Sequence, residues 1–286
     1  MTSDATVIAD ARTGSATADA VTPPVEYGTT LSADGTTLGY YRRGSGPALV
    51  ITHGSIATGD QWLPATEHLA EHFTCFVHDR RGRGRSGDHA TYDLSTEVDD
   101  IAAMMAVAGP GAHLLGHSYG ALCTLAYAER LPLDGTLILF EPPLAVHGPV
   151  AGAGLARYRE LVDAGDLDGA LEHALVNFVR LPAEAIPYVR QTPLWDQCVP
   201  LTPTWVRELE QIDARGADLD HYASITAPTH LIAGTGTTAF LYESAHRLVG
   251  IVPGAGITDL PDLDHFAHVA APELFATTVR QAVSGR

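Results

Sequence analysis

The stretch GHSYG at residues 116–120 decides how this sequence folds. It joins an apolar run at residues 112–115 to a helical pattern at residues 119–130. The pattern G-x-S-x-G between a strand and a helix predicts a sharp turn that lifts a serine hydroxyl above the end of a sheet. Small residues are needed two positions before and after the serine because neighbouring backbone comes close there. The stretch therefore predicts that Ser118 is a nucleophile at the start of a helix.

Short apolar runs alternate with helix-length segments along the rest of the chain. Strands are expected at residues 48–52, 74–78, 112–115, 136–140 and 229–233, with a short one at 257–260. Helices are expected at residues 63–72, 96–108 and 119–130, with a last helix starting near Ala271. The runs are apolar throughout, which is typical of strands buried on both faces. The alternation predicts an α/β fold with a doubly wound, mostly parallel sheet.

The two ends of this pattern define the predicted organisation. Residues 27–31 and 37–42 flank an Ala-Asp-Gly turn, which predicts a hairpin at an antiparallel edge of the sheet. Residues 1–25 are rich in Thr, Ala, Asp and Ser and predict a flexible tail. They lack the basic start and apolar segment of a secretory signal, so we expect a cytoplasmic protein.

The alternation stops between residues 142 and 226. Helical patterns at residues 155–164, 167–179 and 204–216 fill this stretch, and several prolines interrupt it. We therefore expect a helical insertion at residues 142–226 within a core formed by residues 26–141 and 227–286.

Composition excludes several classes of function. The 286 residues carry 17 basic and 34 acidic side chains, a formal charge of −17, and every basic residue is arginine. Without lysine, neither Schiff-base chemistry nor a P-loop lysine is available. The acidic balance disfavours nucleic acid and anionic membranes as partners. No apolar run approaches the length of a membrane span, and Cys75, Cys123 and Cys198 are expected to be buried reduced thiols.

Four motifs in this order resemble the α/β-hydrolase family. Besides GHSYG, they are HGS at residues 53–55, DRRGRGRS at residues 79–86 and DHF at residues 264–266. The resemblance covers roughly residues 26 to 283. It implies that HGS lies in the oxyanion loop, that DRRGRGRS is a structural turn with locally paired charges, and that the inserted helices form a cap over the active site.

The resemblance also implies a catalytic base and acid, because a serine hydroxyl needs both to act as a nucleophile. His265 is assigned as the base, rather than His268, because the family's base follows directly on a strand-end turn. The family's usual acid position, residues 234–238, holds no carboxylate. The alternative position after the preceding strand holds Glu141, which is assigned as the acid. Weaker candidates for the acid are Asp262, Asp264 and Glu243.

The remaining site residues follow from the same resemblance. The oxyanion hole is expected to use the backbone N–H groups of Tyr119 and Ser55, with Ile56 as the alternative to Ser55. His117 is expected to pack beneath the turn. Weak candidates for substrate binding are Ile56, Phe178, Tyr188 and Trp195.

Neither a metal nor a cofactor is expected. The stretch HLAEH at residues 68–72 matches a zinc-binding pattern, but no third ligand is identifiable and the side chains fit the solvated face of a helix.

The expected function is hydrolysis of a carboxylic ester, lactone or thioester through an acyl-enzyme at Ser118. A small-molecule acyl compound is the expected substrate. The alternative is an acyltransferase or cyclase of natural-product biosynthesis that uses the same triad. An acyl-carrier protein is one partner that could supply its acyl group. A cofactor-free perhydrolase or lyase and a non-catalytic binding protein are the remaining readings. Serine in place of aspartate at the nucleophile position argues against epoxide hydrolysis and dehalogenation.

Overall fold

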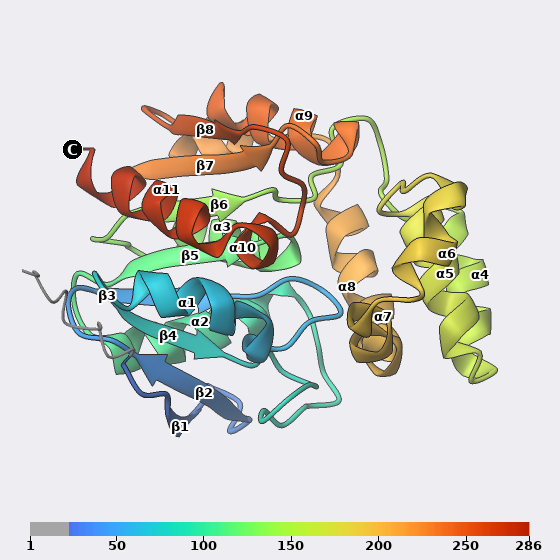
Figure 1. The fold of residues 1–286 in the computed structure, drawn as a ribbon, viewed down its shortest axis with the longest axis horizontal. Coiled ribbons are helices and arrows are strands. Elements are labelled where there is room, and N and C mark those ends of the chain that lie inside the picture. The colour runs from blue at the N-terminus through green and yellow to red at the C-terminus, as the bar shows by residue number, and fades with distance from the viewer. Residues whose placement is uncertain (1–22, 286) are drawn as a thin grey trace, which may run out of the picture.

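A single eight-stranded sheet forms the centre of the computed structural model, which describes residues 23–285 (Figure 1). Its strands are β1 (Glu26–Leu31), β2 (Thr37–Arg43), β3 (Ala48–Thr52), β4 (Thr74–His78), β5 (His113–His117), β6 (Leu137–Phe140), β7 (Thr229–Gly234) and β8 (Gly256–Leu260). They lie in the order β1-β2-β4-β3-β5-β6-β7-β8. The predicted tail at residues 1–25 lies outside the described residues except for its last three positions.

The pairing of the strands confirms the predicted mostly parallel sheet. β1 and β2 form the antiparallel hairpin at one edge, and β2 also runs antiparallel to β4. All pairs from β4 across to β8 are parallel. The central strands β5 and β6 are buried along their whole length, which explains why their sequences are apolar rather than alternating.

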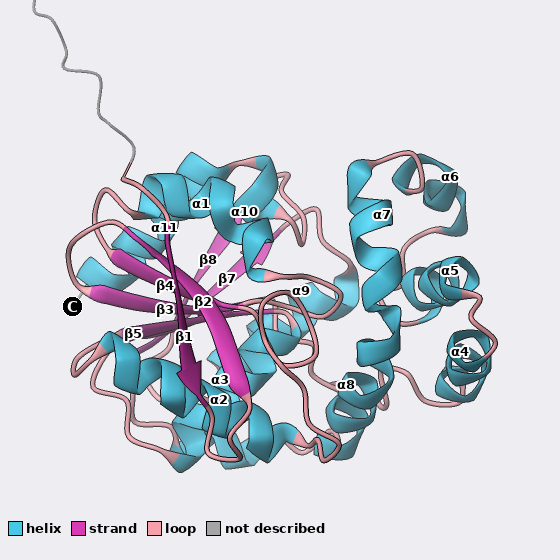
Figure 2. Ribbon diagram, turned by 90° about the horizontal axis from the view of Figure 1, so that it is seen from below, coloured by secondary structure: helices cyan, strands magenta, loops and turns pink. Residues whose placement is uncertain are grey.

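Helices cover both faces of the sheet, as Figure 2 shows. One face is covered by α1 (Leu63–Leu69), α10 (Ala267–Ala270) and α11 (Pro272–Ser284). The other face is covered by α2 (Leu94–Ala108), α3 (Tyr119–Arg130) and α9 (Ala239–Val249). Each face has its own apolar core, as expected for a doubly wound sheet.

A group of helices inserted between β6 and β7 lies beyond the carboxyl ends of the parallel strands (Figure 1). It comprises α4 (Gly154–Asp163), α5 (Leu167–Asn177), α6 (Ile186–Val189), α7 (Pro193–Cys198) and α8 (Thr202–Arg215). We call these five helices the cap. The short helices α6 and α7 were not predicted, because their prolines were taken as interruptions. Both prolines stand in the first turn of their helix, where a missing N–H costs little.

Among residues 23–285, no helix combines the length and the apolar character that crossing a membrane requires.

Candidate active site

Ser118 lies on a strained turn between β5 and α3. Its φ of 54° and ψ of −126° place a non-glycine residue in a region that L-amino acids rarely adopt. The flanking glycines make this turn possible. A Cβ on Gly120 would lie 2.2 Å from the carbonyl oxygen of Thr52, and one on Gly116 would lie 2.6 Å from the Cα of Ala121. The predicted requirement for small residues here therefore has a direct steric cause.

Ser118 and His265 line the same cavity beneath the cap. The cavity has a volume of about 160 Å³, and apolar side chains form most of its wall. A smaller cavity of about 40 Å³ adjoins it and shares Ser118, His265 and Trp205 with it. The structure thus brings the predicted nucleophile and base together at the carboxyl edge of the sheet.

Glu141 orients the ring of His265. The Nδ1 atom of His265 lies 2.5 Å from Oε2 of Glu141, whose side chain is fully buried at the end of β6. The backbone N–H of Gly234 donates to Oε1 at 2.8 Å, and the hydroxyl of Thr237 donates to Oε2 at 2.8 Å. The loop at the family's usual acid position therefore supplies hydrogen-bond donors to Glu141 in place of a carboxylate.

None of the weaker candidates for the acid is hydrogen-bonded to His265 among the described residues, although Asp264 lines the same cavity as His265. Asp264 accepts a hydrogen bond from the backbone N–H of Phe266, and Glu243 pairs with His147 on an exposed surface. Asp262 is exposed on a turn with a φ of 58°. Of the carboxylates considered, Glu141 alone forms a hydrogen bond with His265 within residues 23–285.

His268, the alternative base, is completely buried in α10. Its ring stacks on Trp62 with a centroid separation of 4.4 Å. Burial, together with the nearby His265, lowers the pKa of His268 to about 3. His268 does not line the cavity, and its neutral ring is packed among aromatic side chains. It is therefore a residue of the core.

His117 packs beneath the turn and supports the backbone of His265. Its ring stacks on Phe140 at 4.8 Å, and its Nε2–H donates to the backbone carbonyl of His265 at 3.0 Å. Burial and the neighbouring His265 hold the pKa of His117 well below its usual value. The neutral ring can therefore donate from Nε2 without placing a second charge beside His265.

The loop at residues 53–55, which is expected to form part of the oxyanion hole, is held by hydrogen bonds to the carbonyl of Gly54. Nδ1 of His53 lies 2.8 Å from this oxygen and the Arg80 guanidinium lies 3.3 Å from it. Since the peptide bond is trans and planar, the N–H of Ser55 points the opposite way from the Gly54 carbonyl. The second expected donor, the N–H of Tyr119, belongs to the first turn of α3, where N–H groups have no intrahelical partner.

The substrate-binding candidates divide into two pairs. Ile56 lines the larger cavity and Phe178 lines the smaller one. Tyr188 and Trp195 line neither cavity, contrary to the expectation. Tyr188 is 76% exposed on α6, and the indole of Trp195 donates to Asp168 within the cap while the Arg190 guanidinium covers its face.

The cap contributes wall residues that were not predicted. Trp205 on α8 lines both cavities, and Leu175 and Val179 line the larger one. The apolar stripe of α8 was visible in the sequence, since Trp205, Leu209 and Ile212 recur at helical spacing. That spacing shows a buried face but not what the face covers.

Two expectations about charged motifs need correction. The zinc-like pattern spans the end of α1, because the helix stops at Leu69 rather than continuing to residue 72. Within residues 23–285, no group of His, Cys, Asp and Glu is arranged to hold a metal ion. The arginines of the turn at residues 79–86 are not all paired locally, because Arg80 and Arg83 both contact Glu208 of the cap.

Comparison with known proteins agrees with this architecture. A model of the alpha/beta hydrolase family matches residues 49–278. The crystal structure of an alpha/beta hydrolase from Sphaerobacter thermophilus superposes with a TM-score of 0.82 and 31% identity, covering 89% of this chain and 99% of that one.

Two curated relatives are also hydrolytic enzymes by name. The 2-(acetamidomethylene)succinate hydrolase of Mesorhizobium japonicum is 24% identical over 249 residues, which cover 83% of this chain and 88% of that protein. The N-formylmaleamate deformylase of Pseudomonas putida is 37% identical over 127 residues, 43% of this chain and 47% of that protein. With the family model matching most of the sequence and the fold in place, this chain belongs to the alpha/beta hydrolase family and is an enzyme of the hydrolase class.

Proposed function

We propose that this hydrolase cleaves a carboxylic ester, lactone or thioester through an acyl-enzyme formed on Ser118. The proposal rests on the arrangement of three side chains at one cavity. Ser118 stands on a strained turn in the cavity wall with His265, and Nδ1 of His265 is held 2.5 Å from the buried Glu141. This arrangement supports nucleophilic catalysis with a base whose tautomer is fixed by an acid.

The proposed reaction proceeds in two halves. The hydroxyl oxygen of Ser118 attacks the substrate carbonyl while Nε2 of His265 takes its proton, and Glu141 stabilises the imidazolium that forms. The N–H groups of Ser55 and Tyr119 hold the negative oxygen of the tetrahedral intermediate. His265 then protonates the leaving group, and the acyl-enzyme is hydrolysed by a water molecule that gives its proton to the same nitrogen.

The cavity wall supports a neutral, apolar acyl group. Side chains such as Leu175, Val179 and Leu241 form most of the wall, and no arginine among residues 23–285 lines either cavity. Two relatives are named for a succinate and a maleamate, which are acidic substrates. A carboxylate of that kind would have no cation to pair with here, and burying an unpaired charge is costly.

Reaction with a fluorophosphonate probe tests the proposal. Intact mass would be measured for the wild type and for Ser118→Ala after the same incubation. We expect one adduct on the wild type and none on the variant. Absence of an adduct on the folded wild type would contradict an activated Ser118.

Substrate class is tested with matched p-nitrophenyl esters. We expect the butyryl ester to be hydrolysed at least tenfold faster than the succinyl ester, which differs by a terminal carboxylate. Equal rates would contradict the neutral acyl group while leaving the acyl-enzyme intact. Adding an alcohol acceptor to the same assay separates hydrolysis from acyl transfer, because transfer produces a new ester in place of the free acid.

A further inference from the structure

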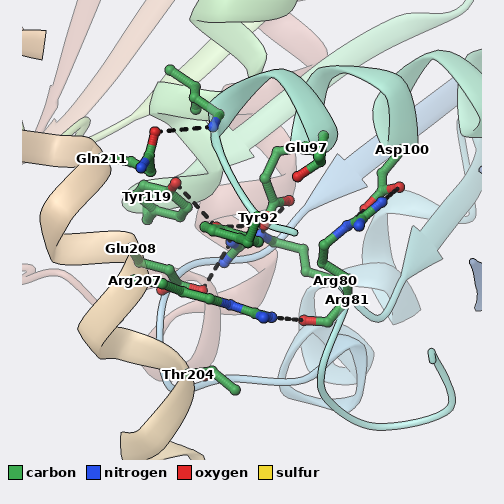
Figure 3. A network of polar contacts seen from close by, with 12 residues as sticks. Arg80, Arg81, Tyr92, Glu97, Asp100, Tyr119, Thr204, Arg207, Glu208 and Gln211 are labelled. Carbon is green, nitrogen blue, oxygen red and sulfur yellow. Dashed lines mark hydrogen bonds and ion pairs between the residues drawn. The ribbon is translucent and has the colours of Figure 1, made fainter. Parts of the chain in front are cut away.

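Arg80 lies at the centre of a network of polar side chains (Figure 3), and its own side chain is fully buried. Its guanidinium forms a two-pronged pair with Glu97 of α2, with nitrogen–oxygen distances of 2.5 and 3.1 Å. The same nitrogen that makes the shorter contact also donates to Glu208 of the cap helix α8 at 2.9 Å. Arg80 thus connects a helix of the core to a helix of the cap.

The same side chain also contacts both parts of the expected oxyanion hole. One guanidinium nitrogen donates to the Gly54 carbonyl at 3.3 Å, on the peptide whose N–H belongs to Ser55. The guanidinium carbon lies 4.6 Å from the ring centroid of Tyr119, the residue after the nucleophile. The backbone N–H of Arg80 donates to Nε2 of His53 at 3.0 Å, which leaves Nδ1 of that ring to donate to the Gly54 carbonyl.

Charge balance in the network depends on the cap. Arg80 and Arg83 face Glu97 and Glu208, and all four side chains are buried in the structure. Glu208 accepts hydrogen bonds from both arginines. Of these four residues, it is the one that belongs to the cap. Without Glu208, Arg83 would lose its ion pair with the cap and Arg80 would keep its pair with Glu97, which leaves one buried guanidinium group without a carboxylate and is unfavourable.

We propose that Arg80 is a positioning residue for the oxyanion hole and that Glu208 couples this role to the seating of the cap. When α8 is docked, Glu208 holds the guanidinium where it can donate to the Gly54 carbonyl. That bond turns the Ser55 N–H toward the cavity. Trp205 lies one turn before Glu208 on the same helix and lines both cavities, so the element that closes over the substrate also completes the oxyanion hole. This role depends on the proposed function, since it acts on the same intermediate.

Two substitutions test the role of the network. Arg80→Lys keeps a positive charge between Glu97 and Glu208, but a single ammonium lacks the second arm that reaches Gly54. Glu208→Gln keeps the shape and an acceptor oxygen while removing the charge from the cap. Loss of one oxyanion donor lowers the rate by about 10²–10³, so a misoriented donor is expected to lower kcat by about 10- to 100-fold in Arg80→Lys and about tenfold in Glu208→Gln. KM is expected to change less than threefold, because neither side chain lines a cavity.

Gln211→Ala provides the matched control. Gln211 is also on α8 and also bridges cap and core, since its side-chain oxygen accepts from the backbone N–H of Leu94 at 3.1 Å (Figure 3). Among the described residues, its side chain forms no hydrogen bond with Arg80, Gly54 or Tyr119. We therefore expect the kcat of Gln211→Ala to stay within twofold of the wild type, even where the melting temperature of this variant falls as much as that of Glu208→Gln.

The measurements are kcat and KM for a neutral ester, the rate of fluorophosphonate labelling at Ser118, and the melting temperature of each variant. A fall in kcat and in labelling rate for Arg80→Lys and Glu208→Gln, with an unchanged control, supports the proposal. Equal falls in all three variants would overturn it, because loosening of the cap would then explain the loss. Variants that lose thermal stability at full kcat would also overturn it. A wild type that neither labels nor turns over would instead overturn the proposed function itself.

Discussion

Replacing Glu141 by glutamine changes one atom at the centre of the candidate site. In the wild type, the two carboxylate oxygens accept three hydrogen bonds, from Gly234, Thr237 and His265. A glutamine offers only one oxygen, so its amide nitrogen must face Gly234 in one orientation and both Thr237 and His265 in the other. Because the side chain is fully buried, no bulk water is available to relieve the conflict.

The size of the effect follows from the two orientations. With the amide nitrogen toward His265, the ring carries its proton on Nε2 and has no base to offer Ser118, a defect that costs about 10⁴ in rate in a comparable triad. With the amide nitrogen toward Gly234, two buried donors oppose each other at a cost of about 1–3 kcal/mol, which keeps this orientation rare. We expect kcat to fall by about 10³–10⁴, equivalent to ~4–5.5 kcal/mol in the activation barrier.

The assay is steady-state hydrolysis of a neutral p-nitrophenyl ester, with the melting temperature measured in parallel. KM is expected to change little, because Glu141 does not line the cavity. Thr237→Val is the control, since it removes one donor to the same oxygen of Glu141 and leaves the bond to His265. It should lower kcat by less than about tenfold, in line with a single lost hydrogen bond. A folded Glu141→Gln variant that keeps more than a tenth of wild-type kcat would refute the assignment of Glu141 as the acid.

Three further predictions concern the fold, its pH dependence and the cavity. Gly120→Ala should destabilise the protein by more than about 2 kcal/mol in urea denaturation, because its Cβ would lie 2.2 Å from a carbonyl oxygen. Gly87→Ala, whose Cβ would have 3.6 Å to its nearest neighbour, should be tolerated, and equal losses in both would contradict the steric explanation. Burial, with the charge of Arg80 nearby, lowers the pKa of His78 to about 4, so between pH 6.5 and pH 4 the unfolded chain binds a proton that the folded protein does not. The contribution of the neutral His78 ring to the free energy of unfolding is fully present above pH 6.5 and is lost as the pH falls towards 4. His78→Leu should therefore reduce the loss of unfolding free energy between pH 6 and pH 5 by about 1 kcal/mol, and an unchanged pH dependence would count against a buried neutral ring. Trp205→Ala should enlarge both cavities and shift the preferred p-nitrophenyl ester toward longer acyl chains, whereas an unchanged chain-length profile would place the acyl group elsewhere.

The sequence by itself determined the sheet and the turn that carries Ser118, because both are encoded by local patterns. Buried parallel strands require apolar runs, and β3 and β4 occupy the residues where those runs predicted them. The turn around Ser118 requires glycine at two fixed positions, because backbone at the end of β3 lies against Gly120 and the first turns of α3 lie against Gly116. Such constraints involve few residues and leave a clear trace in the sequence.

Tertiary structure decided which distant residues meet. The pairing of Glu141 with His265 joins positions 124 residues apart, and only the family resemblance suggested it. The contact between Arg80 and Glu208 spans 128 residues and left no local trace, so the arginine was expected to pair within its own turn. The lining of the cavity also depended on tertiary structure. The sequence of α8 predicted an apolar face, but only the structure shows that Trp205 faces the cavity while Trp195 packs inside the cap. Hydrophobic periodicity records that a side chain is buried, whereas its neighbours depend on how the helices dock.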